Sequence, residues 1–259
     1  MVSAVRGRLA RMCGRYAATA NPDDLVEEFE VDADQTGGEL QPRYNLAPTD
    51  PAPVVVERTP KDEPEASPER TLRLLTWGLV PSWAKDRSVG NRMINARADT
   101  VLEKPAYKRA ALARRCLVPA DGWYEWQRRG PKDKQPYFMT DPDGDVLAFA
   151  GLWAVWGRGD DRVLSCCILT AAALGDLTLI HDRMPLVLAR DAWDAWLTAE
   201  PADAERLLTP SAEIVSGLEV RPVGARVGDV HNDGPSLIER VDAPAVDALS
   251  QDRADLTLF

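Results

Sequence analysis

Histidine, cysteine and long apolar runs are scarce in this chain of 259 residues, and each scarcity excludes a class of protein. Two His and four Cys, with no CxxC or HExxH pair, leave little from which to build a zinc site, so we expect no metal and no cofactor. Four cysteines are also too few for the disulfide framework of a secreted protein. No apolar segment approaches the roughly 20 residues that a membrane-spanning helix needs. We therefore expect a soluble protein of the reducing cytoplasm.

Charge is unevenly distributed along the chain. The net charge of -10, taken alone, argues against a polyanionic partner. Residues 83–135 hold thirteen Lys or Arg against six Asp or Glu, a net charge of +7, whereas the chain from Asp191 on is strongly acidic. Such polarity would let the molecule present one positive face. From charge alone, an ordinary solvated surface explains these basic residues equally well.

Short segments that are rich in β-branched and aromatic residues and bounded by Gly, Pro or Asp predict closely spaced strands. They are residues 71–81, 115–126, 135–140, 146–156, 163–172 and 185–189. The connections PDG (142–144) and GRGDD (157–161) are typical of hairpin turns, so we expect mostly antiparallel pairing. The charged, Pro-rich stretch 57–70 predicts an exposed hairpin insertion rather than a domain boundary.

Helices are expected between these strands. PDDLVEEFEV (22–31) has Pro at a plausible helix start and acidic residues in its first turns, which suits the helix dipole. Further helical stretches are expected near 104–114, 174–181 and 191–208. The sequence contains no internal repeat and no linker between two cores. We therefore predict a single α+β domain around a curved, mostly antiparallel, barrel-like β-sheet with flanking helices.

Cys13 is the residue with the most distinctive chemical potential, because it follows Met12 and a short basic segment without a core pattern. If translation begins at Met12, or if the preceding residues are cleaved, Cys13 becomes N-terminal and carries an amine and a thiol on adjacent carbons. Such a pair condenses with an aldehyde, since the amine forms a Schiff base and the thiol closes a five-membered thiazolidine. A small buried cysteine near the start of a strand is the alternative.

His181 and Glu125 are candidate acid–base residues. His181 lies in LIHDRMP at a junction between elements, where an imidazole could shuttle protons to an imine or a sugar oxygen. The alternative is a structural histidine hydrogen-bonded to Asp182 or to the backbone. Glu125 lies in GWYEW, where strand alternation points it away from Tyr124 and Trp126. It could hold an amine in place, or it could be a surface residue of a half-exposed strand.

Asn95, Arg97 and Trp83 have side chains that suit a nucleic-acid ligand. Asn95 and Arg97 in MINAR would project to one side of an extended segment and offer an amide and a guanidinium to a phosphate or sugar. Trp83 in the charged, Pro-bounded segment PSWAKD could stack on a base. A tryptophan that anchors its own loop is the competing interpretation.

An ordered series of motifs from Cys13 to about Ile238 resembles the SRAP family of abasic-site processing proteins. The motifs are MCGRYA, RYNLAPT, WGLVPSWAKD, MINARADT, PADGWYEW, AGLW, LTAAA and IHDRMPLVL. Each motif is weak alone, but the series is highly specific. The resemblance implies a single α+β domain with a positively charged groove for single-stranded DNA, and an N-terminal cysteine that forms a thiazolidine cross-link with abasic sites.

The resemblance also implies a role for each matching residue. Cys13 would be the nucleophile, and Asn95 would position the sugar or the forming ring. Glu125 would orient and deprotonate the α-amine, while His181 would assist sugar-ring opening and proton transfer. Phosphate and stacking contacts in the DNA groove would come from Arg15, Asn45, Trp83, Arg97 and Arg183.

The implied function is a single-turnover reaction that shields an abasic site in single-stranded DNA during replication. Members of the family have been regarded as thiol autopeptidases, so autoproteolytic removal of a leader is an expected side activity, as is weak abasic-site lyase activity. The expected partners are abasic single-stranded DNA and the replication machinery, for a monomer associated with the nucleoid. We expect residues 1–12 to be a leader absent from the mature protein, 13–240 to form the domain, and 241–259 to form an acidic tail.

Two other functions stay open at this point. A thiol peptidase acting on proteins would use Cys13, His181 and Glu125 or Asp182 as a triad, and would remain active with a blocked α-amine. A non-catalytic module that binds single-stranded nucleic acid would form no covalent conjugate, so Cys13→Ala would change nothing on a denaturing gel.

Overall fold

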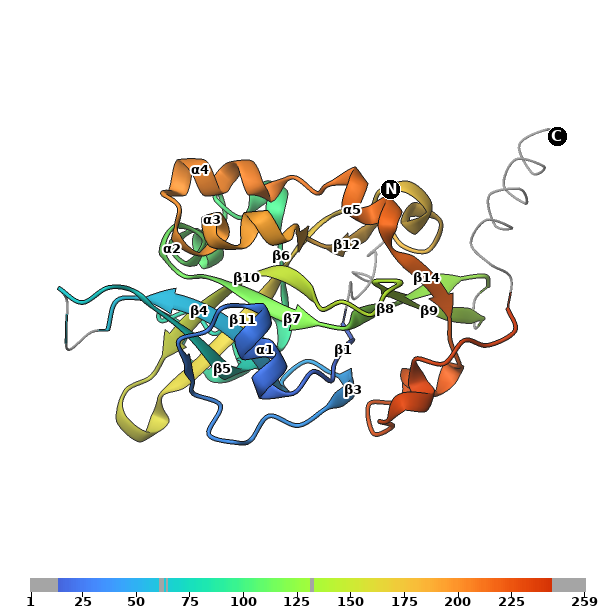
Figure 1. The fold of residues 1–259 in the computed structure, drawn as a ribbon, viewed down its shortest axis with the longest axis horizontal. Helices are drawn as coiled ribbons and strands as arrows, with labels where there is room; N and C mark the ends of the chain where they lie inside the picture. The colour runs from blue at the N-terminus through green and yellow to red at the C-terminus, as the bar shows by residue number, and fades with distance from the viewer. Residues whose placement is uncertain (1–13, 61–62, 64, 131–132, 244–259) are drawn as a thin grey trace, which may run out of the picture.

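The fold is given by a computed structural model that describes residues 14–60, 63, 65–130 and 133–243 (Figure 1). The α-helices are short and lie outside the sheets: α1 (Pro22–Glu28), α2 (Pro105–Ala113), α3 (Trp193–Thr198), α4 (Pro201–Glu205) and α5 (Ala212–Gly217). The 3₁₀ turns that concern the site are η1 (Arg87–Arg92), η2 (Ala98–Thr100), η4 (Gly175–Leu179) and η6 (Arg206–Leu208).

The larger sheet closes on itself. Its order is β12-β11-β10-β7-β4-β5-β2, and β11 pairs a second time with β5, which completes a barrel of β4, β5, β11, β10 and β7. The strands are β2 (Ala33–Asp34), β4 (Pro51–Arg58), β5 (Glu69–Trp77), β7 (Arg115–Ala120), β10 (Leu147–Trp156), β11 (Val163–Ala172) and β12 (Arg183–Pro185). Two short strands join its rim: β6 (Asn95–Arg97) beside β11, and β13 (Val187–Leu188) beside β10.

A second, fully antiparallel sheet packs against one end of this barrel. Its order is β14-β9-β8-β1-β3, formed by β1 (Tyr16–Ala18), β3 (Arg43–Leu46), β8 (Gly122–Arg128), β9 (Lys134–Thr140) and β14 (Glu219–Pro222). Aromatic side chains join the two sheets: the Tyr16 ring lies 5.1 Å from that of Trp77, and the Trp123 ring lies 5.9 Å from that of Phe149.

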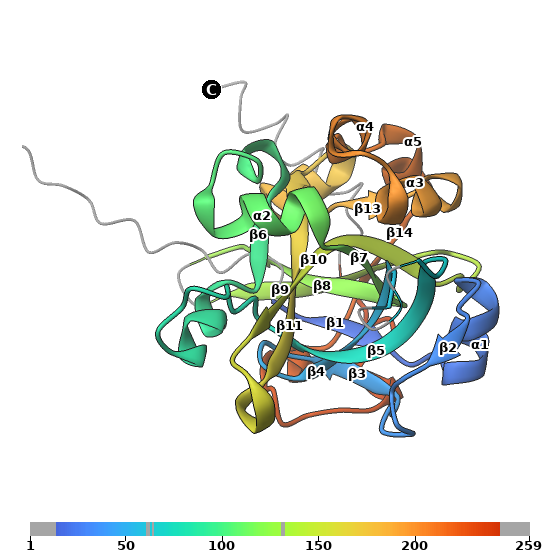
Figure 2. The ribbon, with the colours of Figure 1, turned by 90° about the vertical axis from the view of Figure 1, so that its left-hand side faces the viewer.

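The core has two main parts, inside and outside the barrel, because successive residues of a strand point to opposite faces. Cys166 is buried in the interior cluster and the next residue, Cys167, in the exterior one. The exterior cluster lies under α1, α2 and α3, which Figure 2 shows outside the ring of strands. There Phe29 stacks on Trp193, with 4.4 Å between ring centroids.

The predicted α+β class and the mostly antiparallel pairing are confirmed. GRGDD (157–161) joins β10 to β11 as a hairpin, with Trp156 opposite Val163. The prediction of a hairpin at PDG (142–144) is wrong, because that segment leads from β9 in one sheet to β10 in the other, and these two strands do not pair. A turn pattern reports local chain reversal, whereas strand pairing depends on distant partners.

Several predicted elements are shorter than expected or divided. The predicted strand 115–126 is split at Asp121 into β7 and β8, and the helix 191–208 is broken before Pro201, since a residue that precedes proline disfavours the helical conformation. The predicted strand 71–81 ends at Trp77. There Gly78 has φ +137, and a Cβ on it would lie 2.6 Å from the carbonyl oxygen of Gly90.

The close packing of the barrel interior can be tested at Gly151. A Cβ there would lie 2.9 Å from both Cys116 Sγ and Val118 Cγ2, and 3.2 Å from Cys167 O. Gly151→Ala is therefore expected to lower the free energy of unfolding by about 1–3 kcal/mol through overpacking. Gly217→Ala is the control, because nothing lies within 4 Å of its Cβ position. Urea unfolding measures both, and equal stability of the two variants would contradict a close-packed interior.

Candidate functional site

Glu125 is a buried carboxylate on β8. Only 4% of its surface is exposed, so the alternative of a solvated surface glutamate is wrong. Its neighbours Tyr124 and Trp126 pack in a cluster on the opposite face of the strand, as the alternation predicted, while Tyr137 faces Glu125 across the β8–β9 pair. A carboxylate buried to this degree requires hydrogen-bonding or cationic partners, which makes its surroundings chemically specific.

His181 follows η4 and is held by two contacts on the same ring nitrogen. The backbone N–H of Arg183 donates to Nδ1 at 3.1 Å, and Asp182 Oδ1 lies 3.0 Å from that nitrogen. These contacts need opposite protonation states of Nδ1. The Asp182 side chain is 86% exposed and can turn to water, so the backbone contact defines the neutral ring, which then carries its proton on Nε2. The contacts match the structural-histidine alternative and fix the ring's orientation.

The loop that carries His181 lies beside β8, the strand of Glu125. Gln127 Nε2, two residues after Glu125, donates to the carbonyl of Leu179 at 3.2 Å. Ala173 N–H donates to the carbonyl of Asp182 at 3.0 Å, which ties the loop to the end of β11. Glu125 and His181 are therefore brought to the same end of the barrel.

Asn95 and Arg97 lie on β6, next to the same end of β11. Asn95 pairs with Ile168 and Arg97 with Thr170, in parallel register. Tyr107 Oη from α2 donates to the carbonyl of Asn95 at 3.2 Å and fixes the strand from outside. The extended conformation places Asn95 and Arg97 on one side of β6, as the sequence predicted.

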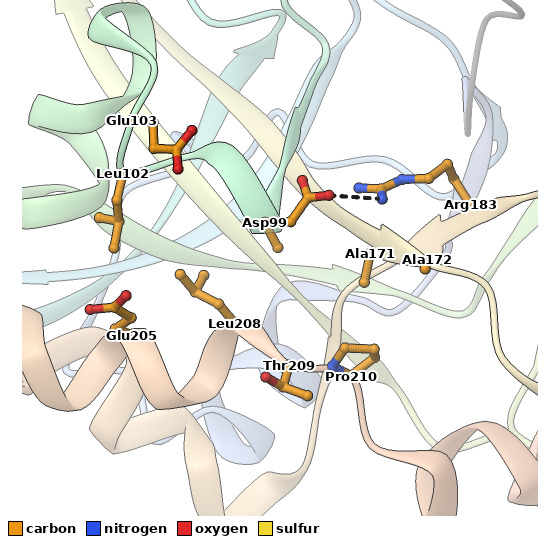
Figure 3. Close-up of a pocket in the computed structure, with 11 residues that line it drawn as sticks. Asp99, Leu102, Glu103, Ala171, Ala172, Arg183, Glu205, Leu208, Thr209 and Pro210 are labelled. Atoms are coloured by element: carbon orange, nitrogen blue, oxygen red, sulfur yellow. Dashed lines mark ion pairs between the residues drawn. The ribbon is translucent and has the colours of Figure 1, made fainter.

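Asp99, which was not predicted as a site residue, connects the cationic side chains of Arg97 and Arg183. Its Oδ2 lies 2.6 Å from Arg97 Nη2. The same oxygen lies 3.8 Å from Arg183 Nη1, the ion pair that is drawn in Figure 3. The hydrogen bond from Arg97 lowers the pKa of Asp99, whereas burial lowers the pKa of the Arg183 guanidinium, which also donates to the Thr170 carbonyl. The spacing of Asp99 two residues after Arg97 was the available signal.

A cavity of about 400 Å³ opens beside Arg183 (Figure 3). Its polar lining comes from Asp99 and Glu103 near η2, from Arg183 on β12, and from Glu205 and Thr209 near η6. Three carboxylates against one guanidinium favour a cation or a hydrogen-bonding neutral group over a phosphate. The interior of the cavity therefore suits a neutral or cationic group better than a phosphate, and its edge borders the cations expected to contact DNA.

Arg15 and Asn45 together hold the loop of residues 227–232. Arg15 Nη1 donates to Asn45 Oδ1 at 3.0 Å and to the Val227 carbonyl at 2.7 Å. The Asn45 amide is fully buried and donates to the carbonyls of Asp229 and Asn232 at 3.0 and 2.9 Å. Contact of either residue with DNA stays a prediction, and an effect of Asn45 would act through Arg15 and this loop.

Trp83 lies apart from these groups, on the segment between β5 and η1. It is 63% exposed, which disfavours the interpretation of a loop anchor and suits stacking on a base. One edge of its loop forms, with Arg109, Arg114 and Trp153, the wall of a cavity of about 140 Å³.

Cys13 lies outside the described residues, as do the expected leader 1–12 and residues 244–259 of the expected tail, so these stay predictions. The chain that follows Cys13 is placed, because the Arg15 carbonyl accepts the backbone N–H of Tyr124 on β8 at 3.0 Å. The cysteines that are described have inert surroundings. Burial raises the pKa of each thiol, to about 12 for Cys166, so Cys116, Cys166 and Cys167 are poor nucleophiles.

Metal-binding clusters and membrane-spanning helices are both absent from the part of the chain that the structure describes. Within residues 14–60, 63, 65–130 and 133–243, no group of three or more His, Cys, Asp or Glu side chains is arranged to hold a metal ion. In the same part of the chain, no helix has the length and apolar character needed to cross a membrane.

Comparison with known families shows a match that covers most of the chain. Residues 12–230 match the model of the family described as SOS response associated peptidase (SRAP). The chain belongs to the SRAP family. Asn95, Glu125 and His181 all lie within the matched part of this SRAP domain, in structural elements that the fold brings to one end of the barrel.

Several relatives of this SRAP chain are named abasic site processing proteins. YoqW of Bacillus subtilis strain 168 is 36% identical, with 88% of this chain and 99% of YoqW aligned. HMCES of Gallus gallus is 34% identical, with 89% of this chain and 74% of HMCES aligned. A crystal structure of a Bacteroides thetaiotaomicron protein shares the fold at a TM-score of 0.74, with 21% identity over 88% of this chain and 100% of that one.

The loop held by Asn45 generates a stability prediction. Asn45→Ala removes buried donors to the carbonyls of Asp229 and Asn232, and the acceptor for Arg15, so we expect the free energy of unfolding to fall by about 1–3 kcal/mol. Hydrogen exchange should speed up first in residues 227–232. Asn91→Ala, at an exposed position, is the control. Unchanged exchange in that loop would contradict the proposed anchoring.

Asp121, at the corner between β7 and β8, generates a pH prediction. Its carboxylate accepts the Thr19 N–H at 2.8 Å, and burial raises its pKa above the usual range. A carboxyl whose pKa is raised by folding costs stability above its unfolded-state pKa, and this cost vanishes as pH falls below that value. Asp121→Asn keeps an oxygen for Thr19 and should be more stable than the natural protein near pH ~7 but not near pH ~3.

Urea unfolding at the two pH values checks this expectation. A destabilised Asp121→Asn variant at neutral pH would show that the charge of Asp121 stabilises the corner, and would contradict the dominance of burial. Asp133→Asn, between β8 and β9 at an exposed position, is the control and should behave alike at both pH values.

Proposed function

We propose that this protein recognises abasic sites in single-stranded DNA and joins itself to them covalently, through a thiazolidine formed by Cys13 as the first residue of the mature chain. The observation that carries the proposal is the buried Glu125 carboxylate, on the strand that pairs with the backbone just after Cys13, at the barrel end where His181 also lies. The names of the relatives, abasic site processing proteins, support the same lesion.

The reach of the chain supports a role for Glu125 beside the α-amine. Arg15 is bound to β8 through Tyr124, and two residues of chain span at most about 7 Å. The α-amine of Cys13 can therefore come within reach of the strand that carries Glu125. A buried carboxylate is stabilised by a cation, and an N-terminal ammonium would supply one.

The proposed reaction is a condensation without any redox change. The α-amine of Cys13 gives up a proton to Glu125 and attacks C1′ of the ring-opened sugar aldehyde. His181 protonates the departing hydroxyl and water leaves. The nitrogen then returns one proton to His181, so that a neutral imine forms. The Cys13 sulfur then attacks the imine carbon, its proton passes to the nitrogen, and the five-membered ring closes. One aldehyde, one amine and one thiol give one thiazolidine and one water, and the protein is consumed.

The surrounding side chains would hold the strand during this reaction. Asn95 on β6 would position the sugar, while Arg97 and Arg183 would pair with flanking phosphates in place of Asp99. Trp83 would stack on a nearby base. An imine that escapes ring closure would undergo β-elimination, which would give weak lyase activity as a side reaction.

A peptidase activity is the second candidate, because the family is described as a peptidase. In our proposal this activity is confined to removal of the residues before Cys13, which exposes the α-amine. A protease acting on other proteins would need only the thiol. The two candidates therefore differ in whether a blocked α-amine abolishes activity.

The decisive experiment uses protein that begins at Met12, together with its Cys13→Ala and Cys13→Ser variants. Each is incubated with abasic single-stranded DNA and run on a denaturing gel. We expect a slowly migrating conjugate from the unmutated protein only, and none when the α-amine is acetylated. Absence of that conjugate would overturn the proposal, and conjugate formation by the acetylated protein would exclude the thiazolidine.

The role of Glu125 is tested separately by rate. Glu125→Gln keeps the size of the side chain but removes the base, so we expect conjugate formation to slow by about 10²–10⁴-fold. Glu213→Gln, an exposed position on α5, is the control. Binding of undamaged DNA and the urea midpoint are measured alongside. A normal rate from a folded Glu125→Gln variant would remove Glu125 from the mechanism.

A further inference from the structure

One open end of the barrel is lined by arginines. The interior positions of β4 and β5 carry apolar residues such as Val54, Val56 and Leu75, and the same strand faces continue to Arg58 and Arg73 where the strands leave the core. Two further arginines precede neighbouring strands at the same end. We call this group the arginine mouth: Arg58, Arg73, Arg114 and Arg162.

The floor of the arginine mouth is Trp153, a residue of the interior core cluster. The guanidinium carbon of Arg58 lies 5.6 Å from the Trp153 ring centroid, and that of Arg114 lies 5.3 Å from it. Both distances are within the range of cation–π attraction. The indole therefore holds two cations in place at the rim without neutralising either of them.

The arginine mouth has a surplus of positive charge. Among the ion pairs of the described residues, none involves Arg58, Arg73, Arg114 or Arg162, whereas Arg70 nearby is paired with both Glu57 and Asp194. Burial lowers the pKa of Arg73, and the charges of Arg58 and Arg162 lower it further. Glu69 offsets only part of this repulsion.

Arg114, the other arginine in contact with Trp153, shows the same effect. Burial lowers its pKa first, followed by the charges of Arg109 and Arg58. Arg58 and Arg114 both lie over the Trp153 ring, at 5.6 and 5.3 Å from its centroid, so neighbouring phosphates of one strand can reach both guanidiniums. An anion bound between them would relieve this repulsion, which is the physical reason to expect a ligand here.

The arginine mouth is continuous with the surface expected to bind DNA. Arg114, Arg109 and Trp153 line the small cavity whose wall includes Trp83. From that point β11 leads to the candidate site: Arg162 directly precedes β11, and Thr170 on β11 pairs with Arg97. Eight residues of strand span roughly 26 Å, a path that Figure 2 shows running from the lower hairpin toward β6.

We propose that the arginine mouth binds backbone phosphates of the single-stranded DNA that extends from the abasic site past Trp83. This inference rests on the proposed function, but it concerns the undamaged flank of the strand and assigns the arginine mouth no part in the chemistry at Cys13. A backbone suits it because several phosphates can each meet one guanidinium, while a base stacks on Trp83. In a chain of net charge -10, such local clusters decide where a polyanion can approach.

The test compares undamaged single-stranded DNA of about 5 and about 20 nucleotides, chosen around the size of common single-strand sites. Arg58→Gln combined with Arg162→Gln removes two charges from the arginine mouth. Arg206→Gln combined with Arg240→Gln removes two charges from exposed positions elsewhere and is the matched control. Fluorescence anisotropy over a salt series gives affinity and its salt dependence for each protein.

We expect the Arg58/Arg162 variant to bind the longer DNA on the order of tenfold more weakly, with the slope of log affinity against log salt reduced by about 1.4. Its affinity for the shorter DNA should match that of the natural protein. Equal losses at both lengths, or an equal loss in the Arg206/Arg240 control, would overturn the proposal. One further result would overturn the proposal: inorganic phosphate raises the melting temperature of the natural protein but not of the Arg58/Arg162 variant, while DNA length has no effect on affinity. The ligand of the arginine mouth would then be a small free anion.

A denaturing gel with a short abasic oligonucleotide separates this inference from the proposed function. Normal conjugate formation together with no length effect would overturn only the arginine mouth as a DNA contact. A missing conjugate together with a clear length effect would overturn the thiazolidine and leave the arginine mouth as a nucleic-acid surface.

Discussion

The pairing of β5 with β11 is the constraint on which the rest of the structure depends. These strands join in parallel at Ser165 opposite Thr76 and Cys166 opposite Trp77, and this contact turns an open sheet into a barrel. Gly78 N–H then donates to the Cys166 carbonyl at 2.8 Å, and Val80 N–H donates to Ser165 Oγ at 2.9 Å. The closure thereby directs the chain after β5 outward, toward Trp83 and on to β6.

The same closure explains why residues distant in the sequence meet at one end of the molecule. Trp77 Nε1 donates to the Ile94 carbonyl at 2.9 Å, directly before Asn95, so the strand that closes the barrel also positions β6. The second sheet supplies Glu125 from β8, and the turn that follows η4 supplies His181. Asn95, Glu125 and His181 therefore each lie on a segment whose position is set by packing or by backbone hydrogen bonds.

Local patterns in the sequence predicted the positions of the strands and turns better than they predicted which strands pair with one another. Alternation in GWYEW correctly separated Glu125 from its aromatic neighbours, and GRGDD correctly joined β10 to β11, because both signals are contained within a few residues. The PDG segment failed because the chain changes sheets there. Asp99 and the arginine mouth were missed, since their significance arises from residues brought together across β4, β5, β7, β11 and β12.

The roles proposed for the candidate residues come from the family motifs, because local patterns could not assign them. Nothing in the spacing of Asn95, Glu125 and His181 places them together, and the fold does so only through two sheets and a connecting turn. Cys13 is the extreme case, because the chemistry that we propose for it depends on a free α-amine. That property is set by the start of the mature chain and not by any side-chain pattern.

The close approach of Gly78 and Gly90 has a consequence for how binding and folding evolve. Because the two backbones nearly touch, the thirteen residues from 78 to 90 form a loop with joined ends, and Trp83 lies near its tip. The loop is tied to the barrel at Ala84, whose carbonyl accepts Trp156 Nε1 of β10 at 2.7 Å, whereas the Trp83 side chain is exposed. Substitutions at its exposed positions, such as Trp83, can therefore accumulate at little cost to stability, provided that the two glycines at its base and the backbone contact at Ala84 are kept.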